Sequence, residues 1–600
     1  MNCTGGDGGS TRRQVCPSDQ FVVEGDSTSL AYRSIWIAVA CVAIAFWILA
    51  FGFGARGSPA ALFSHFYGDG QHQRLAGNGK CGREYIANRD HAGGDLGTFS
   101  AAGDWLLGGL LAADTFNDGK SCLSRREAVL YRKALPWKPS SYLVKSLRRY
   151  EARHRHCAPY TESYNKTLSL LQNLTEMSAQ TPECKYVVWT PRDGLGNRML
   201  SLVSAFLYTL LTGRVLLIDS SKDMADLFCE PIPGSTWLLP PDFPLGRFHT
   251  FDRNHPQSYG MLTKNKSAVP GGRIPGVVYL YLAHNYDDDD KAFFCECAGE
   301  GSLSLQKIPW MVMKSNQYFV PALFLNPAFE GELRRLFPEK EAVFHHLARY
   351  LFHPTNAVWG LITRYYWAYL AKADEQIGIQ IRVFNKKTSP FEVVLNQIVN
   401  CTLSKKLLPE VMKKHNEKNY NLRGKLAAAA GSVEGGDRKR RPLKAVLLTS
   451  LSSGYLEKIK DMYWEHPAAA GGGGEVDVSV HQPSHEEWQQ TERGQHDMKA
   501  LAEMYLLSLS DALVTSGWST FGYVAQAMGG LRPWILLTPP GKGREPEPAC
   551  VRALSPEPCF HYPPNFQQCG QGKDKRTWVA PNYVKLCEDT LTGLKLVQPS

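Results

Sequence analysis

The sequence predicts an α/β protein made of two doubly wound, Rossmann-like domains behind an N-terminal transmembrane anchor. Three observations support this prediction: an uncharged span at 34–55, short apolar runs alternating with helical periodicity, and a recurrence of that rhythm in two clusters, about 185–365 and 376–540. Strands that alternate with helices form parallel sheets covered on both faces. Ligands of such folds bind at the carboxyl ends of the strands, so we expect the site in a cleft between the two domains.

Length and composition narrow the class of protein. The chain has 600 residues, of which 44% are hydrophobic and 21% charged, with 67 Lys+Arg against 57 Asp+Glu. This excludes a mainly disordered, collagen-like or polytopic membrane protein. The basic residues are scattered apart from one run, Arg438–Arg441, so no nucleic-acid partner is expected.

The N-terminus predicts a single-pass membrane protein. The span 34–55 is long enough to cross a bilayer, which takes roughly 20 apolar residues. Arg12, Arg13 and Arg33 precede it and only Arg56 follows closely, which places the tail 1–33 in the cytosol and the bulk in the lumen. A cleaved signal peptide is the alternative, disfavoured because signal peptides have shorter apolar regions. The Gly- and His-rich segment 56–103 reads as a stem.

Cysteines and glycosylation sequons agree with a lumenal location. Twelve of the 15 cysteines follow the span, an even number that suits a disulfide-bonded domain, although the sequence does not reveal the pairing. Cys295 and Cys297 resemble a metal pair, but no second pair follows at ligand spacing, so disulfides are preferred. The sequons beyond the span are Asn165, Asn173, Asn265 and Asn400.

The ordered part is expected to comprise 104–370, 371–545 and a cysteine-rich tail, 546–600. Two low-complexity stretches, 424–442 and 468–474, read as surface insertions of the second domain. The first cluster predicts a strand at Tyr186–Trp189, a helix over Arg198–Thr212 closed by Gly213, and a strand at Val215–Ile218. The second cluster predicts strands at Ile377–Phe384, Ala445–Leu448, Val476–Val480, Ala512–Thr515 and Trp534–Leu537, and a helix over Ser519–Met528.

The loop Asp193–Arg198 lies between a predicted strand and helix. Its glycines allow a ligand close to the backbone, the helix start offers free N–H groups, and Arg198 adds a cation. A plain turn with a helix cap is an equally good interpretation.

Gln380 and Arg382 share one face near the end of the Ile377–Phe384 strand. A strand buried on both faces is normally apolar throughout, so this polar pair needs a reason. Arginine suits bidentate contact with phosphate; a salt-bridged arginine on an edge strand is the alternative.

The turn Thr515–Gly522 is rich in hydroxyl groups and precedes a predicted helix. Hydroxyl side chains there can cap the helix and bind an anion. Capping alone explains Ser519 or Thr520 more readily than the whole turn.

Gln482–Glu487 contains the capping-box pattern of Ser484 and Glu487, which predicts a helix start. Gln482, His485 and Glu486 are nevertheless candidates to face a nucleotide.

The acidic segment His284–Asp290 admits three interpretations: a Mg²⁺ or Mn²⁺ site, a solvated loop, or the source of a general base. Metal binding is disfavoured because arginine and helix starts already match a phosphate's charge.

Several stretches, in order along about 104–563, resemble the plant cell-wall α-1,2-fucosyltransferases of the xyloglucan fucosyltransferase family. They include GLGNRMLSLVSAFLYTLLTGRVLLID, GIQIRVF, QPSHEEWQQTE, VTSGWSTFGYVAQAMGGLRPWIL, KIPWMVMKSNQYFVPALF and EPCFHYPP. The resemblance implies a variant GT-B fold in a Golgi type II membrane protein. It implies inverting transfer of L-fucose from GDP-β-L-fucose to O2 of a galactosyl or related residue of a glycan, with no cofactor and no required metal. It also allows a homodimer.

The resemblance assigns the first domain mainly to the acceptor and the second to the donor. It implies donor binding by a set drawn from several segments: Asn197, Arg198, Thr355, Asn356, Gln380, Arg382, Gln482, His485, Ser519, Thr520, Phe521 and Gly522. Arg382 is also expected to stabilise the leaving diphosphate. Asp288 is the hypothesis for a general base, because Asn285 replaces an aspartate of the family pattern.

Three alternatives stay open at this point. A non-catalytic glycan-binding or scaffold protein would keep the fold without turnover. A protein O-fucosyltransferase would use the same donor. Arabinogalactan-protein or pectic glycans compete with xyloglucan as the acceptor.

Overall fold

The computed structural model describes a compact unit of the chain, Thr98–Ser600, and not the N-terminal unit. The described residues are 104, 106–113, 121–172, 182–219, 224–246, 248–265, 275–295, 305–412, 440–469, 474–490, 494–541, 543–566 and 580–599. The predicted tail, anchor and stem, most of the insertion 424–442 and the sequon at Asn173 lie outside them. Among these described residues, no helix combines the length and apolarity needed to cross a membrane.

The first sheet contains four parallel strands in the order β2-β1-β4-β3. They are β1 (Tyr186–Thr190), β2 (Val215–Ile218), β3 (Val277–Leu282) and β4 (Trp310–Ser315). Every residue of these strands is buried, as expected for parallel strands covered on both faces. β1 and β2 confirm the predicted strands, whereas β3 and β4 were not predicted.

The second sheet has seven strands in the order β11-β10-β9-β5-β6-β8-β7. Its strands are β5 (Glu375–Ile381), β6 (Leu443–Ser450), β7 (Ala468–Ala469), β8 (Glu475–His481), β9 (Ala512–Ser516), β10 (Trp534–Leu536) and β11 (Cys550–Arg552). The inner pairs are parallel, and the edge strands β7 and β11 run antiparallel. The chain is therefore a mixed α/β fold with two largely parallel sheets.

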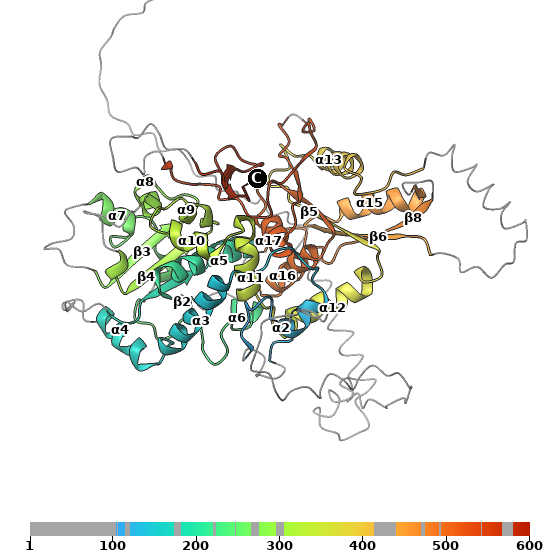
Figure 1. Ribbon diagram of the computed structural model, residues 1–600. Helices are drawn as coiled ribbons and strands as arrows, with labels where there is room; N and C mark the ends of the chain where they lie inside the picture. Colours follow the sequence, from blue (N-terminus) through green and yellow to red (C-terminus); the bar gives the residue numbers. More distant parts are fainter. Residues whose placement is uncertain are drawn as a thin grey trace, which may run out of the picture. The chain divides into compact units, whose positions relative to one another are not determined.

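Four helices occupy the region between the sheets (Figure 1). They are α5 (Leu195–Thr212), α11 (Val343–Leu351), α16 (Gly494–Ser508) and α17 (Thr520–Gly529). All four are largely buried and pack against one another, so the first residues of α5 and α17 are held inside the fold. A left-handed glycine ends two of them, Gly213 after α5 and Gly530 after α17.

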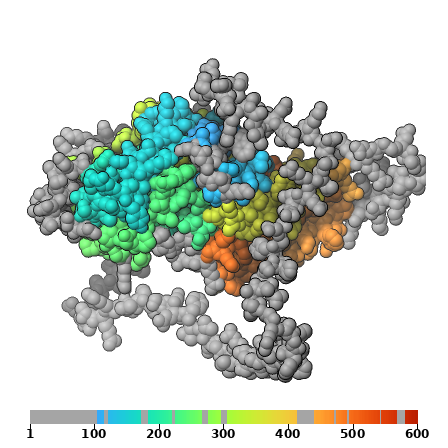
Figure 2. All heavy atoms as spheres, turned by 90° about the horizontal axis from the view of Figure 1, so that it is seen from below, coloured from blue at the N-terminus to red at the C-terminus, as the bar shows by residue number. Residues whose placement is uncertain are grey.

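The remaining helices surround this core. They are α2 (Leu123–Glu127), α3 (Ser141–His156), α4 (Glu162–Gln172), α6 (Met224–Leu227), α7 (Tyr259–Lys264), α8 (Asp288–Lys291), α9 (Val320–Phe324), α10 (Glu330–Leu336), α12 (Asn356–Tyr365), α13 (Phe391–Ser404) and α15 (Gly454–Glu465). Of these, α3 and α7 contact the first sheet, α13 and α15 contact the second, and others, such as α12 against α16, pack on helices. Short 3-10 or π turns occur at Ala128–Leu130, Phe248–Thr250, Ala292–Cys295, Leu305–Lys307, Lys340–Ala342 and Tyr366–Leu370. The tail forms a hairpin of β12 (Val584–Leu586) and β13 (Leu594–Leu596). In Figure 2 the blue surface near α2 adjoins the yellow surface of α12, where the Leu123 N–H donates to Asn356 Oδ1 at 2.8 Å.

Disulfides tie distant segments of the described chain together. The pairs are Cys122–Cys229, Cys157–Cys184, Cys401–Cys550 and Cys559–Cys587, and Cys295 is also disulfide-bonded. This confirms the expected disulfide-bonded domain and supplies pairings that the sequence did not reveal. Asn165, Asn265 and Asn400 are exposed, so their glycosylation stays a prediction that the structure permits.

The structure corrects several element boundaries. The strand predicted to reach Phe384 ends at Ile381, and the helix predicted from Arg198 begins at Leu195. No helix follows Ser484, whose hydroxyl donates to Glu503 instead of capping. The insertion at 468–474 is not wholly loop, because Ala468 and Ala469 form an edge strand.

Two charged segments are also more ordered than predicted. Arg440 and Arg441 of the basic run form ion pairs with Asp374 and Glu475. The acidic segment forms the short helix α8, where Asp287 and Asp290 make a reciprocal capping box.

Candidate donor site

A cavity of about 370 Å³ lies where the carboxyl ends of the two sheets face each other. Three loops of the first sheet line it: Asp193–Asn197 after β1, His284 after β3, and Asn316 with Gln317 after β4. The second sheet lines it as well, with Ser450 at the end of β6, Arg382 after β5, Ser484 after β8 and Trp518–Phe521 after β9. This placement is the one expected for a ligand site in parallel α/β sheets.

Two helix N-termini converge on this cavity. Gly194 precedes α5 and Ser519 precedes α17, and no side chain caps either helix. A Cβ atom on Gly196 would lie 2.8 Å from the carbonyl carbon of Thr520, so only glycine lets the two helix starts approach this closely. Uncapped N-terminal N–H groups carry partial positive charge and bind anions.

Arg382 adds a full positive charge beside these helix starts. It is the first residue after β5; its backbone N–H donates to Ser516 Oγ at 2.9 Å, and its Nη2 donates to Gln489 Oε1 at 2.6 Å. Partial burial lowers the pKa of the guanidinium from its usual value. Gln380 lies on β5 with its Oε1 accepting from the Ser516 N–H at 3.3 Å, so the end of β5 is tied to the turn that carries Ser519.

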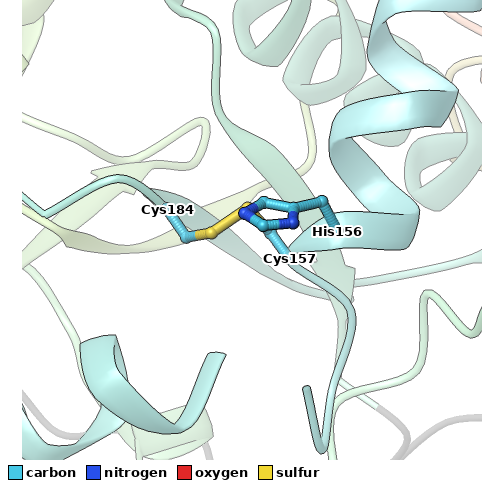
Figure 3. Close-up of side chains that lie close together, drawn as sticks. All are labelled: His156, Cys157 and Cys184. Carbon is cyan, nitrogen blue, oxygen red and sulfur yellow. A yellow bond between two sulfur atoms is a disulfide. The ribbon is translucent and has the colours of Figure 1, made fainter. Parts of the chain in front are cut away.

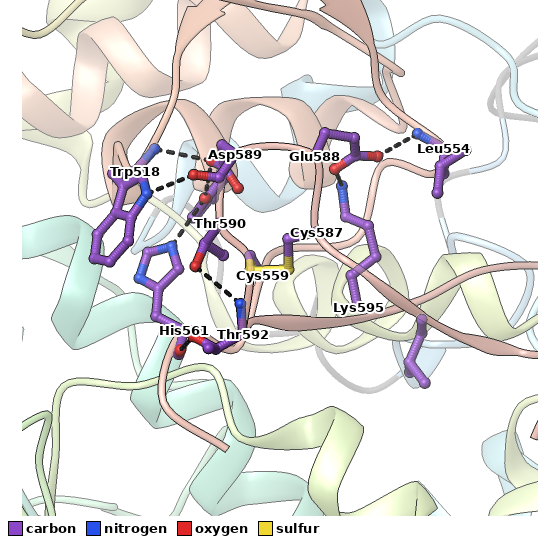
Figure 4. Close-up of a disulfide and its surroundings, with 12 residues drawn as sticks. Trp518, Leu554, Cys559, His561, Cys587, Glu588, Asp589, Thr590, Thr592 and Lys595 are labelled. Atoms are coloured by element: carbon purple, nitrogen blue, oxygen red, sulfur yellow. Dashed lines mark hydrogen bonds and ion pairs between the residues drawn. A yellow bond between two sulfur atoms is a disulfide. The ribbon is translucent and has the colours of Figure 1, made fainter. Parts of the chain in front are cut away.

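The C-terminal tail supports the turn that carries Ser519 (Figure 4). Trp518 adopts a left-handed φ of 62°, which is uncommon for a bulky side chain. Its backbone N–H donates to Asp589 Oδ2 at 2.8 Å, its indole N–H donates to the Asp589 carbonyl at 2.6 Å, and its ring stacks on His561 at 4.5 Å. The Cys559–Cys587 disulfide joins the two segments that carry His561 and Asp589, so the tail holds Trp518 from both sides.

One wall of the cavity is acidic. Glu486 pairs with Lys499 at 2.6 Å, and the hydrogen bond from Lys499 lowers the pKa of that carboxyl. Burial raises the pKa of Glu503 to about 7, while Ser484 donates a hydrogen bond to it. This wall offers hydrogen-bond acceptors to the edge of a bound base.

Six of the predicted donor-binding residues line the cavity: Asn197, Gln380, Arg382, Ser519, Thr520 and Phe521. Gly522 lies just behind them, where a Cβ atom would approach Thr515 and Gln380 within about 3.0 Å. The structure thus gathers residues more than 300 positions apart along the chain.

The remaining predicted residues do not line the cavity. Arg198 is 1% exposed and its Nη2 pairs with Asp497 at 2.6 Å, so its charge is committed to a buried ion pair between α5 and α16. Thr355 and Asn356 hydrogen-bond to Asp226 and Leu123, at the start of α12.

Gln482, His485 and the proposed base Asp288 are also outside the lining of the cavity. Gln482 donates to the Ser450 and Ser484 carbonyls, and His485 is absent from the lining. The Asp288 side chain is 91% exposed and pairs with Lys291, so the structure gives the proposed base no contact with the cavity.

Several lining residues were missed. Asn316 is one of them, whereas Asp193 and His284 belonged to the candidate segments Asp193–Arg198 and His284–Asp290 without an individual role. His284 follows β3 and Asn316 follows β4, two strands that were not predicted. The apolar runs Val277–Leu282 and Trp310–Ser315 were the signal for them. His561 and Tyr562 lay in a quoted stretch without a role.

Two clusters of His, Cys and Asp side chains within the described residues have metal-like spacing. One is His156 with Cys157 and Cys184 (Figure 3), and the other is Cys559 and Cys587 with Asp589. In both clusters the sulfurs form a disulfide and are not thiolate ligands. Neither cluster therefore offers a metal site.

Comparison with known proteins settles the family. The model of the xyloglucan fucosyltransferase family matches residues 88–569. The chain belongs to the xyloglucan fucosyltransferase family.

Relatives within this family are close. The galactoside 2-alpha-L-fucosyltransferase of Pisum sativum is 53% identical over 504 residues, covering 84% of each chain. The enzyme of the same name from Arabidopsis thaliana is 52% identical over 496 residues, covering 82% of this chain and 83% of its own. The solved structure of a mutant of Arabidopsis thaliana FUT1 in complex with GDP has 50% identity and a TM-score of 0.70, covering 82% of this chain and all of its own.

Proposed function

We propose that the protein is an inverting α-1,2-fucosyltransferase that moves L-fucose from GDP-β-L-fucose to O2 of a galactosyl residue of a cell-wall glycan. The observation that carries the proposal is the meeting of two uncapped helix N-termini and Arg382 in one cavity at the carboxyl ends of both sheets. Such a cluster suits a diphosphate. The family, and the GDP complex of a relative that is 50% identical, support GDP as the nucleotide.

The donor is proposed to lie with its diphosphate between the starts of α5 and α17. Asn197, Ser519, Thr520 and the following backbone N–H groups would bind the phosphate oxygens, with Arg382 beside them. Gln380 and Gly522 would shape this pocket from behind. The acidic wall at Glu486 and Glu503 would face the guanine, whose edge presents N–H donors.

This arrangement suits the chemistry of fucosyl transfer. As the bond from C1 of fucose to the β-phosphate breaks, the sugar gains positive charge and GDP gains negative charge. Arg382 and the two helix starts are fixed before the reaction, so they stabilise the developing charge without reorganising. This charge matching is the reason to propose that no metal is required.

The acceptor is proposed to be a galactosylated glycan such as xyloglucan. Support comes from the family and from the word galactoside in the names of the two relatives. Arabinogalactan-protein and pectic glycans present related sugars and serve as comparison substrates.

The cellular setting is part of the proposal. We infer a Golgi type II membrane protein with its anchor at 34–55, a variant GT-B fold and N-glycans at the exposed sequons. The asymmetric arginines around 34–55 and the disulfides of the described domain support this setting. A homodimer is compatible with it.

A transfer assay tests the proposal. The lumenal part from Asp104 is incubated with GDP-fucose and EDTA, together with galactosylated xyloglucan oligosaccharides, arabinogalactan glycans or peptides, and products are identified by mass and linkage. We expect fucose on O2 of galactose in xyloglucan. Addition to peptides alone would indicate a protein O-fucosyltransferase, and absence of GDP binding by the folded protein would contradict the donor site.

A further inference from the structure

Three loops at the carboxyl ends of the first sheet form the cavity wall opposite the second sheet. Asp193 follows β1, His284 follows β3 and Asn316 follows β4, and all three line the cavity. The Asn316 amide nitrogen donates to Asp193 Oδ2 and lies 2.7 Å from His284 Nδ1. Its Oδ1 accepts from the His284 backbone N–H at 3.0 Å, which fixes the orientation of the amide. One asparagine therefore holds the other two side chains together.

These hydrogen bonds assign a role to each side chain. Because the Asn316 amide donates to His284 Nδ1, the neutral imidazole carries its proton on Nε2 and acts as a hydrogen-bond donor. Asp193 only accepts. Its side chain is 41% exposed, and its nearest cation is Arg192, with Nε 3.8 Å from Oδ1. The Asp193 carboxylate thus keeps open acceptor capacity toward the cavity.

Each of the other carboxylates that line the cavity has an ion-pair or hydrogen-bond partner and lies on the side proposed to face the guanine. Glu486 pairs with Lys499, and Asp497 pairs with buried Arg198. Glu503 is 7% exposed and accepts from Ser484. All three belong to the second-sheet side, whereas Asp193 lies on the first-sheet side. The proposed function leaves that side of the cavity for the acceptor.

We infer that Asp193 is the general base of the transfer, with Asn316 as a positioning residue and His284 as a hydrogen-bond donor to a sugar oxygen. This inference rests on the proposed function. Asp193 takes the proton from the O2 hydroxyl of galactose as that oxygen forms a bond to C1 of fucose. The bond from C1 to the β-phosphate oxygen breaks, and GDP leaves with the electron pair. The charged or titratable groups beside Asp193 are Arg192 from its own loop and His284, which shares the Asn316 amide. Arg382 lies on the other side of Gln489, whose amide nitrogen is 3.0 Å from the place of a Cβ on Gly194.

The backbone at Asp193 permits a clean test. Asp193 has a φ of 62°, a conformation that asparagine also tolerates, so Asp193→Asn removes the base and keeps the turn. We expect kcat to fall at least about 100-fold, in the range of lost general-base catalysis, with the Kd for GDP changed less than about twofold. The acid limb of the kcat–pH profile should disappear as well. Asp242→Asn, an exposed aspartate, is the matched control and should match wild type.

A second variant tests whether Asn316 influences the Asp193 carboxylate as a base. Asn316→Asp places a carboxylate beside Asp193, and like charge raises the pKa of a carboxyl group. We expect this variant to transfer fucose with the acid limb of its kcat–pH profile at higher pH than in wild type. An acid limb that stays in place would contradict the role of Asn316.

The outcomes separate this inference from the proposed function. If wild type transfers fucose and Asp193→Asn keeps a third or more of kcat, or if Asp288→Asn shows the loss instead, the base assignment is wrong and the proposed function stands. If wild type neither binds GDP nor transfers fucose to any acceptor, the proposed function fails and the base assignment fails with it.

Discussion

At the scale of single residues, Arg382 carries most of the proposed donor chemistry. It is the first residue after β5, half-buried, with one guanidinium nitrogen hydrogen-bonded to Gln489. The sequence predicted its importance because a polar pair at the end of a buried strand is unusual. The predicted face was slightly wrong, since the strand ends at Ile381 and Arg382 belongs to the loop.

Replacing Arg382 should abolish most turnover. We expect Arg382→Ala to lower kcat for fucosyl transfer by about 100-fold or more. Loss of one preorganised hydrogen-bond donor to the developing negative charge typically lowers kcat by about that factor. Arg382→Lys should recover only part of it, since lysine lacks the planar fork. Arg440→Ala is the control, because Arg440 makes a surface ion pair with Asp374 outside the cavity. Wild-type turnover in Arg382→Ala would remove the diphosphate role.

Glu557 provides a residue-scale test of pH dependence. Its carboxylate is 1% exposed and accepts hydrogen bonds from the Phe344 N–H at 2.8 Å and from the Tyr318 hydroxyl. Burial raises its pKa to about 7 from an ordinary 4.5, so the folded protein binds this proton more tightly than the unfolded chain does. The contribution of Glu557 to the free energy of unfolding is therefore fully present below pH 4.5 and decreases as pH rises toward 7.

We accordingly expect Glu557→Gln to be more stable relative to wild type at pH 8 than at pH 5. Glutamine keeps the carbonyl for Phe344 and carries no charge to desolvate. Thermal unfolding at both pH values measures this difference, with exposed Glu465→Gln as the control. An equal effect of Glu557→Gln on stability at both pH values would contradict a raised pKa for Glu557.

At the scale of elements, the starts of α5 and α17 form the site together. Their sequences predicted a helix after a glycine-rich loop and a helix after a hydroxyl-rich turn. Both helices are confirmed, and each begins within three residues of its predicted start. Their proximity was not predictable from either segment, because 325 positions separate Gly196 from Phe521. Only the packing of α5 against α17 brings these positions together.

A substitution at Gly196 tests whether the close approach of the starts of α5 and α17 is needed for GDP binding. An alanine Cβ would meet Thr520 at 2.8 Å and the Phe521 nitrogen at 3.0 Å, so one helix start has to move. We expect Gly196→Ala to lower stability by about 1–3 kcal/mol and to weaken GDP binding by at least about tenfold. Calorimetric titration with GDP measures the second effect.

Gly331→Ala in α10 is the matched control. Nothing lies within 4 Å of an added Cβ there, so alanine should raise stability by about 0.5–1 kcal/mol and leave GDP binding unchanged. Unchanged GDP binding in Gly196→Ala would contradict the importance of the approach.

At the scale of the whole molecule, the sequence predicted two parallel-sheet clusters and the structure confirms two such sheets. Periodicity identifies strands and helices because it depends on neighbours along the chain. It does not identify loops that meet in space. Asp193, His284 and Asn316 belong together through hydrogen bonds across 32 and 123 positions, and Arg198 was assigned to the donor although it pairs with Asp497.

The most direct test of the central claim measures backbone amides, because the account assigns the diphosphate to them. Hydrogen–deuterium exchange is followed in the disulfide-intact protein with and without saturating GDP. We predict slower exchange in both 194–198 and 519–523 when GDP is bound, with no change in α3, Ser141–His156. Exchange that is unchanged in both segments at saturating GDP would contradict the donor site proposed between the two helices.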